Sequence, residues 1–213
     1  RLVMSAEQRE ALYNSPSQVY DHPKVESQMS ELNGSVFNQN FNFSKTPSLL
    51  LVGLVRKDVL RPSLITTDAN LNSNFNTVSP DVLTFQSIHI NTNYGRIPSN
   101  EDYSFAKSNG VISNAGSMRV YEELKKVFKN ADCVPVGYRT FMSNFTWVPY
   151  LINTNNECAF TQATRLERGT VNITANLVGR ASPVVWSDYA LVTIAFTSYQ
   201  FTAVGLKTII AAI

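Results

Sequence analysis

The chain has 213 residues with a formal net charge of +2, 16% charged and 44% hydrophobic residues, and a pI near 8.5. Nucleic-acid-binding domains usually show clustered Lys and Arg with a pI above about 9, so this composition disfavours a specific nucleic-acid site. No apolar run approaches the roughly 20 residues that span a bilayer, so we expect a soluble protein without a membrane span. The length fits one large all-β domain.

The first 45 residues are mostly polar and contain one short helical signal. Ser5 stands three residues before Gln8, which is the spacing of a capping box and predicts a short helix over 5–13. Val and Phe residues interleaved with Asn make 34–43 a candidate strand. Because the sequence begins at Arg1 without Met, and no charged-then-apolar leader follows, we expect a fragment or a processed product.

Two apolar segments in the next part of the chain predict strands. Residues 48–55 are apolar almost throughout, which is typical of a central strand. Residues 56–80 form a long polar stretch, and loops beyond about 12 to 15 residues are usually functional or interaction elements. Apolar positions in 83–90 predict another strand, which ends at the turn signal of 93–95.

A helix and two further strands are predicted between these segments and the C-terminal part. In residues 116–129 the apolar side chains fall on one stripe of a helix, with Glu and Lys outside it. Residues 138–145 and 147–152 are rich in aromatic and apolar side chains, and we predict strands there. Strands therefore dominate, and the helices are insertions in connecting loops.

The most regular pattern lies near the C-terminus, in two strand-like runs joined by a turn at 179–183. Between residues 165 and 177, apolar residues alternate with Asn and Thr, which predicts a half-buried antiparallel strand. The run over 188–203 is nearly all apolar around its centre, as expected of a strand covered on both sides. Together with the long connections, these runs predict an all-β sandwich of Greek-key or jelly-roll topology, with short helices inserted in its connecting loops.

Few residues suggest chemistry. Phosphate loops, nucleophile elbows and zinc-binding helix motifs are absent from the sequence. Residues 68–74 begin like a calcium loop, but the turn Gly and the closing Glu are missing. His22 and His89 are too few for a cupin-type metal site, and we expect a structural role for His89. We therefore predict no catalytic, cofactor-binding or metal-binding residues.

The remaining reactive or modifiable groups favour ordinary structural roles. Cys133 and Cys158 allow one disulfide or two free thiols, and we favour free thiols because disulfide scaffolds are usually denser in Cys. The acidic pairs at 101–102 and 122–123 indicate solvated surface. In a chain rich in Asn and Thr, we attribute to chance the glycosylation sequons that begin at Asn33, Asn42, Asn144 and Asn172.

The order of these segments resembles the C-terminal jelly roll of double jelly-roll major capsid proteins, as found in Polinton-type elements, adintoviruses and virophages. The resemblance covers most of the chain and rests on pattern and spacing. The segments that carry it are 46–55, 83–91, 95–99, the helix with Tyr121 and Phe128, and 167–169 before the final strands.

The resemblance implies a structural protein and no enzyme or cofactor. Capsid proteins of this family form trimers that tile an icosahedral shell, so the expected partners are other copies of the chain and penton or minor capsid proteins. The expected location is the virion capsid, assembled inside the host cell. One jelly roll is half of such a subunit. The other half would be a separate chain or upstream sequence, unless the chain is a single jelly-roll penton or minor capsid protein.

We expect a single domain over 1–213, with an N-terminal part (1–45), a main sandwich (46–204) and an apolar tail (205–213), within a larger capsid protein. The tail is too apolar to remain free, so we predict that it docks on this domain or on a neighbour. The candidate subunit contacts are Leu206, Ile209, Ile210 and Ile213.

A secreted carbohydrate-binding sandwich is the alternative from another functional class. Such a module would use the sequons and would expose several aromatic side chains on one face as a platform for sugars. Burial of Trp147 and Tyr150 would remove that platform.

Overall fold

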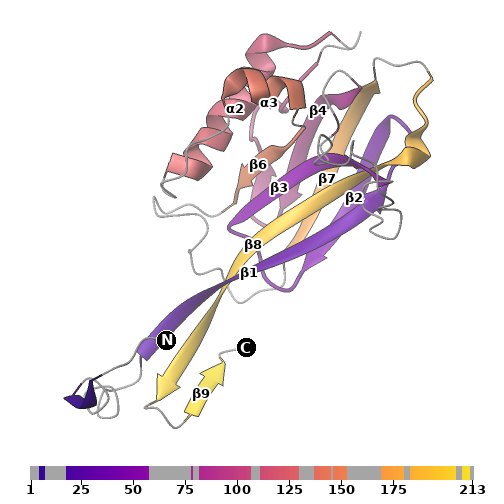
Figure 1. Cartoon of the computed structure of the whole chain (residues 1–213). Coiled ribbons are helices and arrows are strands. Elements are labelled where there is room, and N and C mark those ends of the chain that lie inside the picture. Colours follow the sequence, from indigo (N-terminus) through magenta and orange to yellow (C-terminus); the bar gives the residue numbers. More distant parts are fainter. Residues whose placement is uncertain are drawn as a thin grey trace, which may run out of the picture.

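The computed structural model describes residues 5–7, 18–57, 78, 82–106, 111–129, 137–144, 146–152, 169–179, 183–204 and 208–211. Two antiparallel sheets make up this part of the chain and face each other as the layers of a sandwich (Figure 1). The predicted all-β sandwich is therefore confirmed. Its elements are β1 (Gln18–Glu31), β2 (Val36–Phe43), β3 (Leu49–Arg56), β4 (Leu83–Thr92), β5 (Gly95–Ile97), α2 (Asn114–Lys129), α3 (Tyr138–Asn144), β6 (Val148–Leu151), β7 (Gly169–Gly179), a 3₁₀ turn (Trp186–Asp188), β8 (Tyr189–Val204) and β9 (Thr208–Ala211).

The strand order is that of a jelly roll. In the described residues, one sheet has the order β1-β8-β3-β6, with β9 beside β8, and the other has the order β2-β7-β4-β5. Four antiparallel pairs run inward from the chain ends: β1 with β8, β2 with β7, β3 with β6, and β4 with β5. Such nesting arises when one long hairpin, with its tip at β4 and β5, is rolled into two sheets.

The sequence periods explain which side of each strand is buried. In β7 the buried positions alternate with more exposed ones, as the Asn and Thr alternation predicts. In β4 the apolar spacing changes from two to three between Phe85 and Ile88, and a register shift between Phe85 and Ser87 in the pairing with β7 accounts for it. Because of this irregularity, Phe85 and Ile88 are both fully buried.

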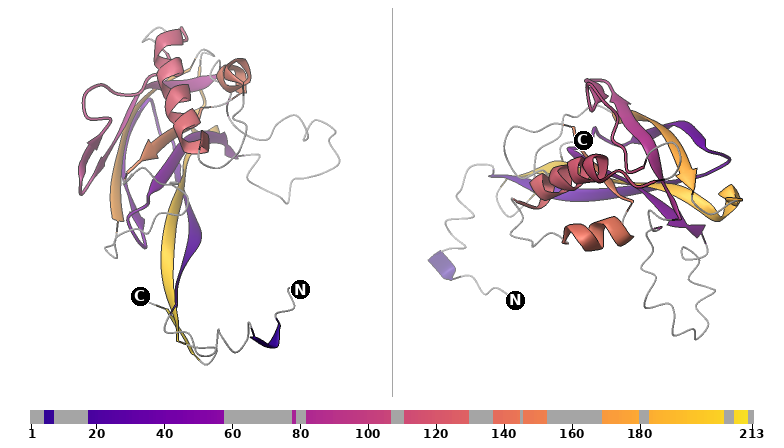
Figure 2. Two further views of the ribbon diagram at one scale, coloured as in Figure 1. Left: turned by 90° about the vertical axis from the view of Figure 1, so that its left-hand side faces the viewer. Right: turned by 90° about the horizontal axis from the view of Figure 1, so that it is seen from above.

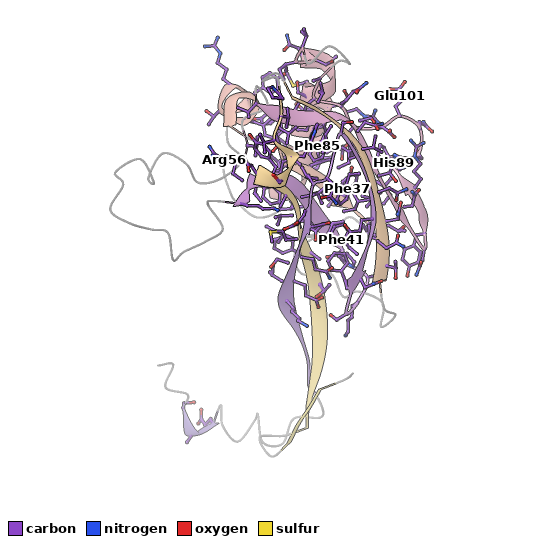
Figure 3. All side chains as sticks on the ribbon, turned by 90° about the vertical axis from the view of Figure 1, so that its right-hand side faces the viewer. Phe37, Phe41, Arg56, Phe85, His89 and Glu101 are labelled. Atoms are coloured by element: carbon purple, nitrogen blue, oxygen red, sulfur yellow. The ribbon has the colours of Figure 1, made fainter. Side chains whose placement is uncertain are left out.

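The core fills the space between the sheets. Phe37, Phe41 and Phe85 lie there (Figure 3) together with Leu50 and Ile173, and all five are buried. A row of ring contacts attaches the helices to this core, because Phe105 contacts both Phe85 and Phe141 of α3, and Phe141 contacts Tyr121 of α2. The helices, inserted between β5 and β6, pack on one side of the sandwich (Figure 2).

Polar contacts join the two sheets along the edge formed by β1 and β2. Gln28 Nε2 donates to the backbone oxygen of Asn42 at 2.6 Å, and Ser30 Oγ donates to Gln39. At the end of β2, the Glu26 carboxylate accepts hydrogen bonds from the backbone N–H of Ser44, at 3.1 Å, and from its hydroxyl. Side chains of the first strand therefore fasten the open edge of the sandwich.

The structure corrects one sequence prediction. Residues 138–144 form a helix and no strand, because Tyr138 and Phe141 stand three residues apart and both contact Tyr121, as neighbours on one helix face do. The two predicted C-terminal strands are both present, as β7 and β8. They lie in opposite sheets, where β7 contacts β2 and β4 while β8 contacts β1 and β3.

Other predictions agree with the structure or lie outside the described residues. Strands over 34–43, 48–55 and 147–152 and the helix over 116–129 are confirmed as β2, β3, β6 and α2. The first strand, β1, was not predicted, since its sequence is polar and lacks a clean period of two. Outside the described residues lie the calcium-like segment 68–74, both cysteines, and residues 8–13 of the first predicted helix.

Substitutions of Tyr150 separate the contribution of its hydroxyl to stability from that of its buried ring. Tyr150 is fully buried, and its hydroxyl has no hydrogen-bond partner in the described residues, so burial raises its pKa well above the ordinary value. We predict that Tyr150→Phe changes the free energy of unfolding by less than about 1 kcal/mol, or stabilises the protein. Tyr150→Ala should cost about 3 to 5 kcal/mol. Urea unfolding of both variants measures this, and a larger loss in Tyr150→Phe would show that the hydroxyl has a partner.

Glu26 gives a pH dependence of stability. Partial burial raises its pKa, but hydrogen bonds from Ser44 and Lys24 together outweigh burial, so the folded-state pKa lies below the ordinary 4.5. A lowered pKa stabilises the fold above pH 4.5, and this contribution disappears as the pH falls through the folded value. Melting temperatures of wild type and Glu26→Gln should therefore differ most near pH 7 and converge towards pH 3.

The control for Glu26 is Glu122→Gln. The Glu122 carboxylate pairs with Lys125 one helical turn away on the surface of α2, at 3.0 Å, and such exposed pairs contribute little. This variant should follow the wild-type pH profile. If Glu26→Gln showed the same pH profile as wild type, the contacts with Ser44 would not contribute to stability.

Candidate functional site

The described residues hold no constellation typical of an enzyme or metalloprotein. No three His, Cys, Asp or Glu side chains in the described ranges lie together as a metal site would require. Among the same residues, no helix is long and apolar enough to cross a membrane. The acidic pair Glu122 and Glu123 is bound to Lys125 and Lys126 on the helix surface, at 3.0 and 2.7 Å. The candidate contact surfaces of the molecule are instead the outer faces of its two sheets.

The outer face of the β1-β8-β3-β6 sheet is largely apolar, with the exposed Ser27 between Val25 and Met29 on β1. The register places Val25 beside Phe196, and Met29 beside Val192, on the side of the sheet away from the core. Val25 is 56% exposed and Met29 is 54% exposed. Two exposed large apolar side chains on the same side of one strand are unusual. We call this surface the apolar face; its half-buried or exposed members are Val25, Met29, Leu51, Leu151, Val192, Ile194 and Phe196.

Part of this outer side is covered by the chain itself. Val127 of α2 packs on Leu49, with Leu51, Leu151 and Phe196 around them. A Cβ atom on Gly53 would lie only 2.4 Å from the Trp147 ring, so the glycine allows the indole to lie against the backbone of β3. The helix and the indole thus cover the β3 and β6 side, and the most exposed apolar side chains lie on β1.

The outer face of the β2-β7-β4-β5 sheet is polar but nearly uncharged. Asn172 lies at its centre and donates to Asn38 Oδ1 at 2.8 Å and to Asn40 Oδ1 at 2.9 Å. Its own Oδ1 accepts from Asn91 at 3.3 Å and from Thr174 at 3.1 Å. We call this surface the amide face; its members are Asn38, Asn40, Asn42, Ser87, Asn91, Thr170, Asn172, Thr174 and Asn176.

One corner of the amide face carries charge. His89 lies on the outer side of β4 (Figure 3), and its Nδ1 is 3.1 Å from Asp102 Oδ1. The two groups are within ion-pair distance, and His89 Nδ1 has no hydrogen-bond partner in the described residues. Arg96 Nη2 also contacts Asp102. Contacts of this kind join the β4–β5 hairpin to the following loop, which agrees with the structural role expected for His89.

The predicted subunit-contact residues are only partly described. Of Leu206, Ile209, Ile210 and Ile213, the structure describes Ile209 and Ile210, in β9, where they pair with Ala203 and Thr202 of β8. That part of the tail therefore lies on its own domain. Contact with a neighbouring copy stays a prediction.

Sequence patterns did not identify the apolar face. Val25 and Met29 lie in a polar stretch, and their shared orientation is visible only once β1 is known to be a strand. Their spacing of four residues is a weak signal, because side chains an even number of residues apart on a strand point to the same face. On the opposite face, the Asn residues were recognised as the wet side of strands.

The alternative of a sugar-binding platform loses one of its two named candidates. Tyr150 is fully buried in the core and contacts the ring of Tyr103 at a centroid distance of 5.5 Å. Trp147 is half-buried, with its ring above Gly53. The burial that would remove the platform is therefore met by Tyr150 and not by Trp147.

Comparison with known proteins identifies the fold. No family model matches the sequence. No curated protein matches it significantly either. Among solved structures, a chain from the Sputnik virophage matches with a TM-score of 0.53 and 13% identity, covering 93% of this chain and 39% of that chain. A chain from the capsid of the virus PBCV-1 matches with a TM-score of 0.54 and 11% identity, covering 97% and 54%.

This chain therefore spans only 39% and 54% of the length of the two solved chains that it matches. Identities of 13% and 11% establish a shared fold and no more. The strand order and these similarities agree: the chain folds as a jelly-roll β-sandwich like those in the structures of Sputnik and the PBCV-1 capsid, as its sequence predicts.

Proposed function

We propose that the chain is a structural capsid protein whose jelly roll assembles with other copies into trimers and then into an icosahedral shell. The observation that carries this proposal is the match of more than nine tenths of the chain to jelly rolls from a virophage and from a virus capsid. The proposed role is mechanical. It requires a rigid block and adhesive surfaces, and no catalytic residue.

The geometry suits such a block. The pairing of β1 with β8 runs over all 14 residues of β1, so the two ends of the domain are held together in one sheet. The helices are fixed to the core through Phe105, Phe141 and Tyr121. Two flat outer faces with almost no charge then remain for contacts with neighbours, and obligate protein interfaces use surfaces of this kind.

The proposed partners follow from the length of the matching chains. A protein that fills about half of each solved chain would need a second jelly roll for a full subunit, on a separate chain or on additional sequence. Penton and minor capsid proteins are further proposed neighbours, and the proposed location is the virion capsid, assembled inside the host cell. A single jelly-roll penton or minor capsid protein is the related alternative, since the described residues build one jelly roll.

Mass measurement and electron microscopy test the proposed function. We expect the purified protein to form trimers by light scattering and larger shells or capsomer-like rings at high concentration, because its outer faces are apolar or neutral. A protein that remained a monomer at all concentrations, alone and with a candidate second jelly roll, would contradict a capsid role.

The tail gives a separate prediction. If residues 205–213 dock on a neighbour as well as on β8, their deletion should convert trimers to monomers. Circular dichroism should show that the sandwich remains folded, because the β1–β8, β2–β7 and β3–β6 pairs do not involve the tail. Met118→Lys, on the exposed surface of α2, is the control for a general loss of association. An unchanged trimer after deletion would exclude the tail from the subunit contact.

A further inference from the structure

We infer that the apolar face of one copy packs on the amide face of a second copy. This inference rests on the proposed function, because a subunit that assembles into rings or shells needs contacts between two different surfaces. A contact of one face with the same face of a partner is complete in a dimer, whereas a contact between unlike faces can be repeated. The sandwich carries two unlike faces on its opposite sides.

The apolar face has the composition of an interface centre. Val25 and Met29 are more than half exposed, and Val192 and Ile194 lie beside them on β8. Charged side chains of β1 and of the end of β3 are paired, Lys57 Nζ with Glu31 Oε1 at 2.7 Å and Lys24 Nζ with Glu26 Oε1 at 3.0 Å. Burial of this surface would therefore release apolar area from water without removing the solvation of an unpaired charge.

The amide face can be buried at low cost because its polar groups bond to one another. An Asn side chain has two N–H donors and an oxygen with two acceptor positions. Asn172 uses all four, with Asn38, Asn40, Asn91 and Thr174. A buried polar group is costly mainly when it lacks a partner, so Asn172 at the centre of this face can lose its water without leaving its own amide unpaired.

The margins of the amide face resemble those of the apolar face. The side chains of Asn38 and Asn40 lie on β2, at the edge of the sheet, and the charged group of Arg96, Asp102 and His89 lies at the opposite margin. Each face thus has an uncharged centre and a polar or charged margin, which is the usual arrangement of a protein interface. The apolar centre of one copy and the self-paired amides of the next are therefore compatible surfaces.

The first experiment measures assembly in two matched variants. Met29→Lys places a charge on the β1 side of the apolar face, where the wild-type side chain is 54% exposed, and Met118→Lys places the same charge on α2, where it is 40% exposed. By light scattering, Met29→Lys should weaken association at least tenfold and Met118→Lys should leave it unchanged. Both should melt like wild type, since each side chain is already exposed. Normal association of Met29→Lys would overturn the inference.

The second experiment identifies the surface opposite Met29. In a background with Cys133→Ser and Cys158→Ser, protein with Met29→Cys is mixed with protein carrying Asn40→Cys, and a short bismaleimide is added. A cross-linked heterodimer of the two variants supports the inference. Cross-linking of Met29→Cys with itself alone would show that apolar faces meet each other and would overturn it.

Failure of the inference and failure of the proposed function remain distinguishable. Wild-type trimers without any cross-link between positions 29 and 40 would leave a capsid role intact but would overturn the contact between these faces. A wild-type protein that never associates would overturn both. Asn172→Leu adds an independent readout: it leaves the amides of Asn38 and Asn40 without their donor, and we expect weaker association without loss of the monomer fold.

Discussion

The pairing of the first strand with the last is the constraint on which the rest of this structure depends. β1 and β8 form a continuous ladder, and β8 then pairs with β3 on its other side. The larger sheet is therefore incomplete until β1 and β8, from the two ends of the domain, pair with each other. Such long-range pairing is slow to form, because the chain loses loop entropy before it gains contacts. In the folded state, this pairing places residues far apart in sequence side by side in one sheet (Figure 2).

The two outer faces differ because the same strand period carries different residues. In β7 the outward positions hold Asn and Thr, whose side chains bond laterally across the sheet. In β8 the outward positions hold Val192, Ile194 and Phe196, which cannot do so and form an apolar surface. Both strands have an apolar inner side, so the core is continuous while the outer sides are chemically distinct. The difference gives the sandwich two chemically distinct outer surfaces.

Local pattern predicted the strands of this fold better than their partners. The alternation in β7, the apolar run in β3 and the apolar stripe of α2 are visible in the sequence. Each of these patterns predicts which side chains of its element are buried. The separation of β7 and β8 into opposite sheets depends on pairing with β2 and β1, which no local period contains. The helix α3 was mistaken for a strand because Phe141 is buried by a tertiary row of rings. The apolar face was missed for the same reason, since β1 becomes recognisable only beside β8.

The sheet edges explain why association would use the faces. An open edge strand invites pairing with another chain, and proteins restrict this with proline and charge. Both edge strands of the larger sheet contain proline, Pro23 in β1 and Pro149 in β6, and proline has no N–H to donate to a new ladder. β1 also carries Lys24, paired with Glu26. With edge-to-edge pairing disfavoured, the uncharged outer sides of the sheets are the surfaces left for specific contacts between copies.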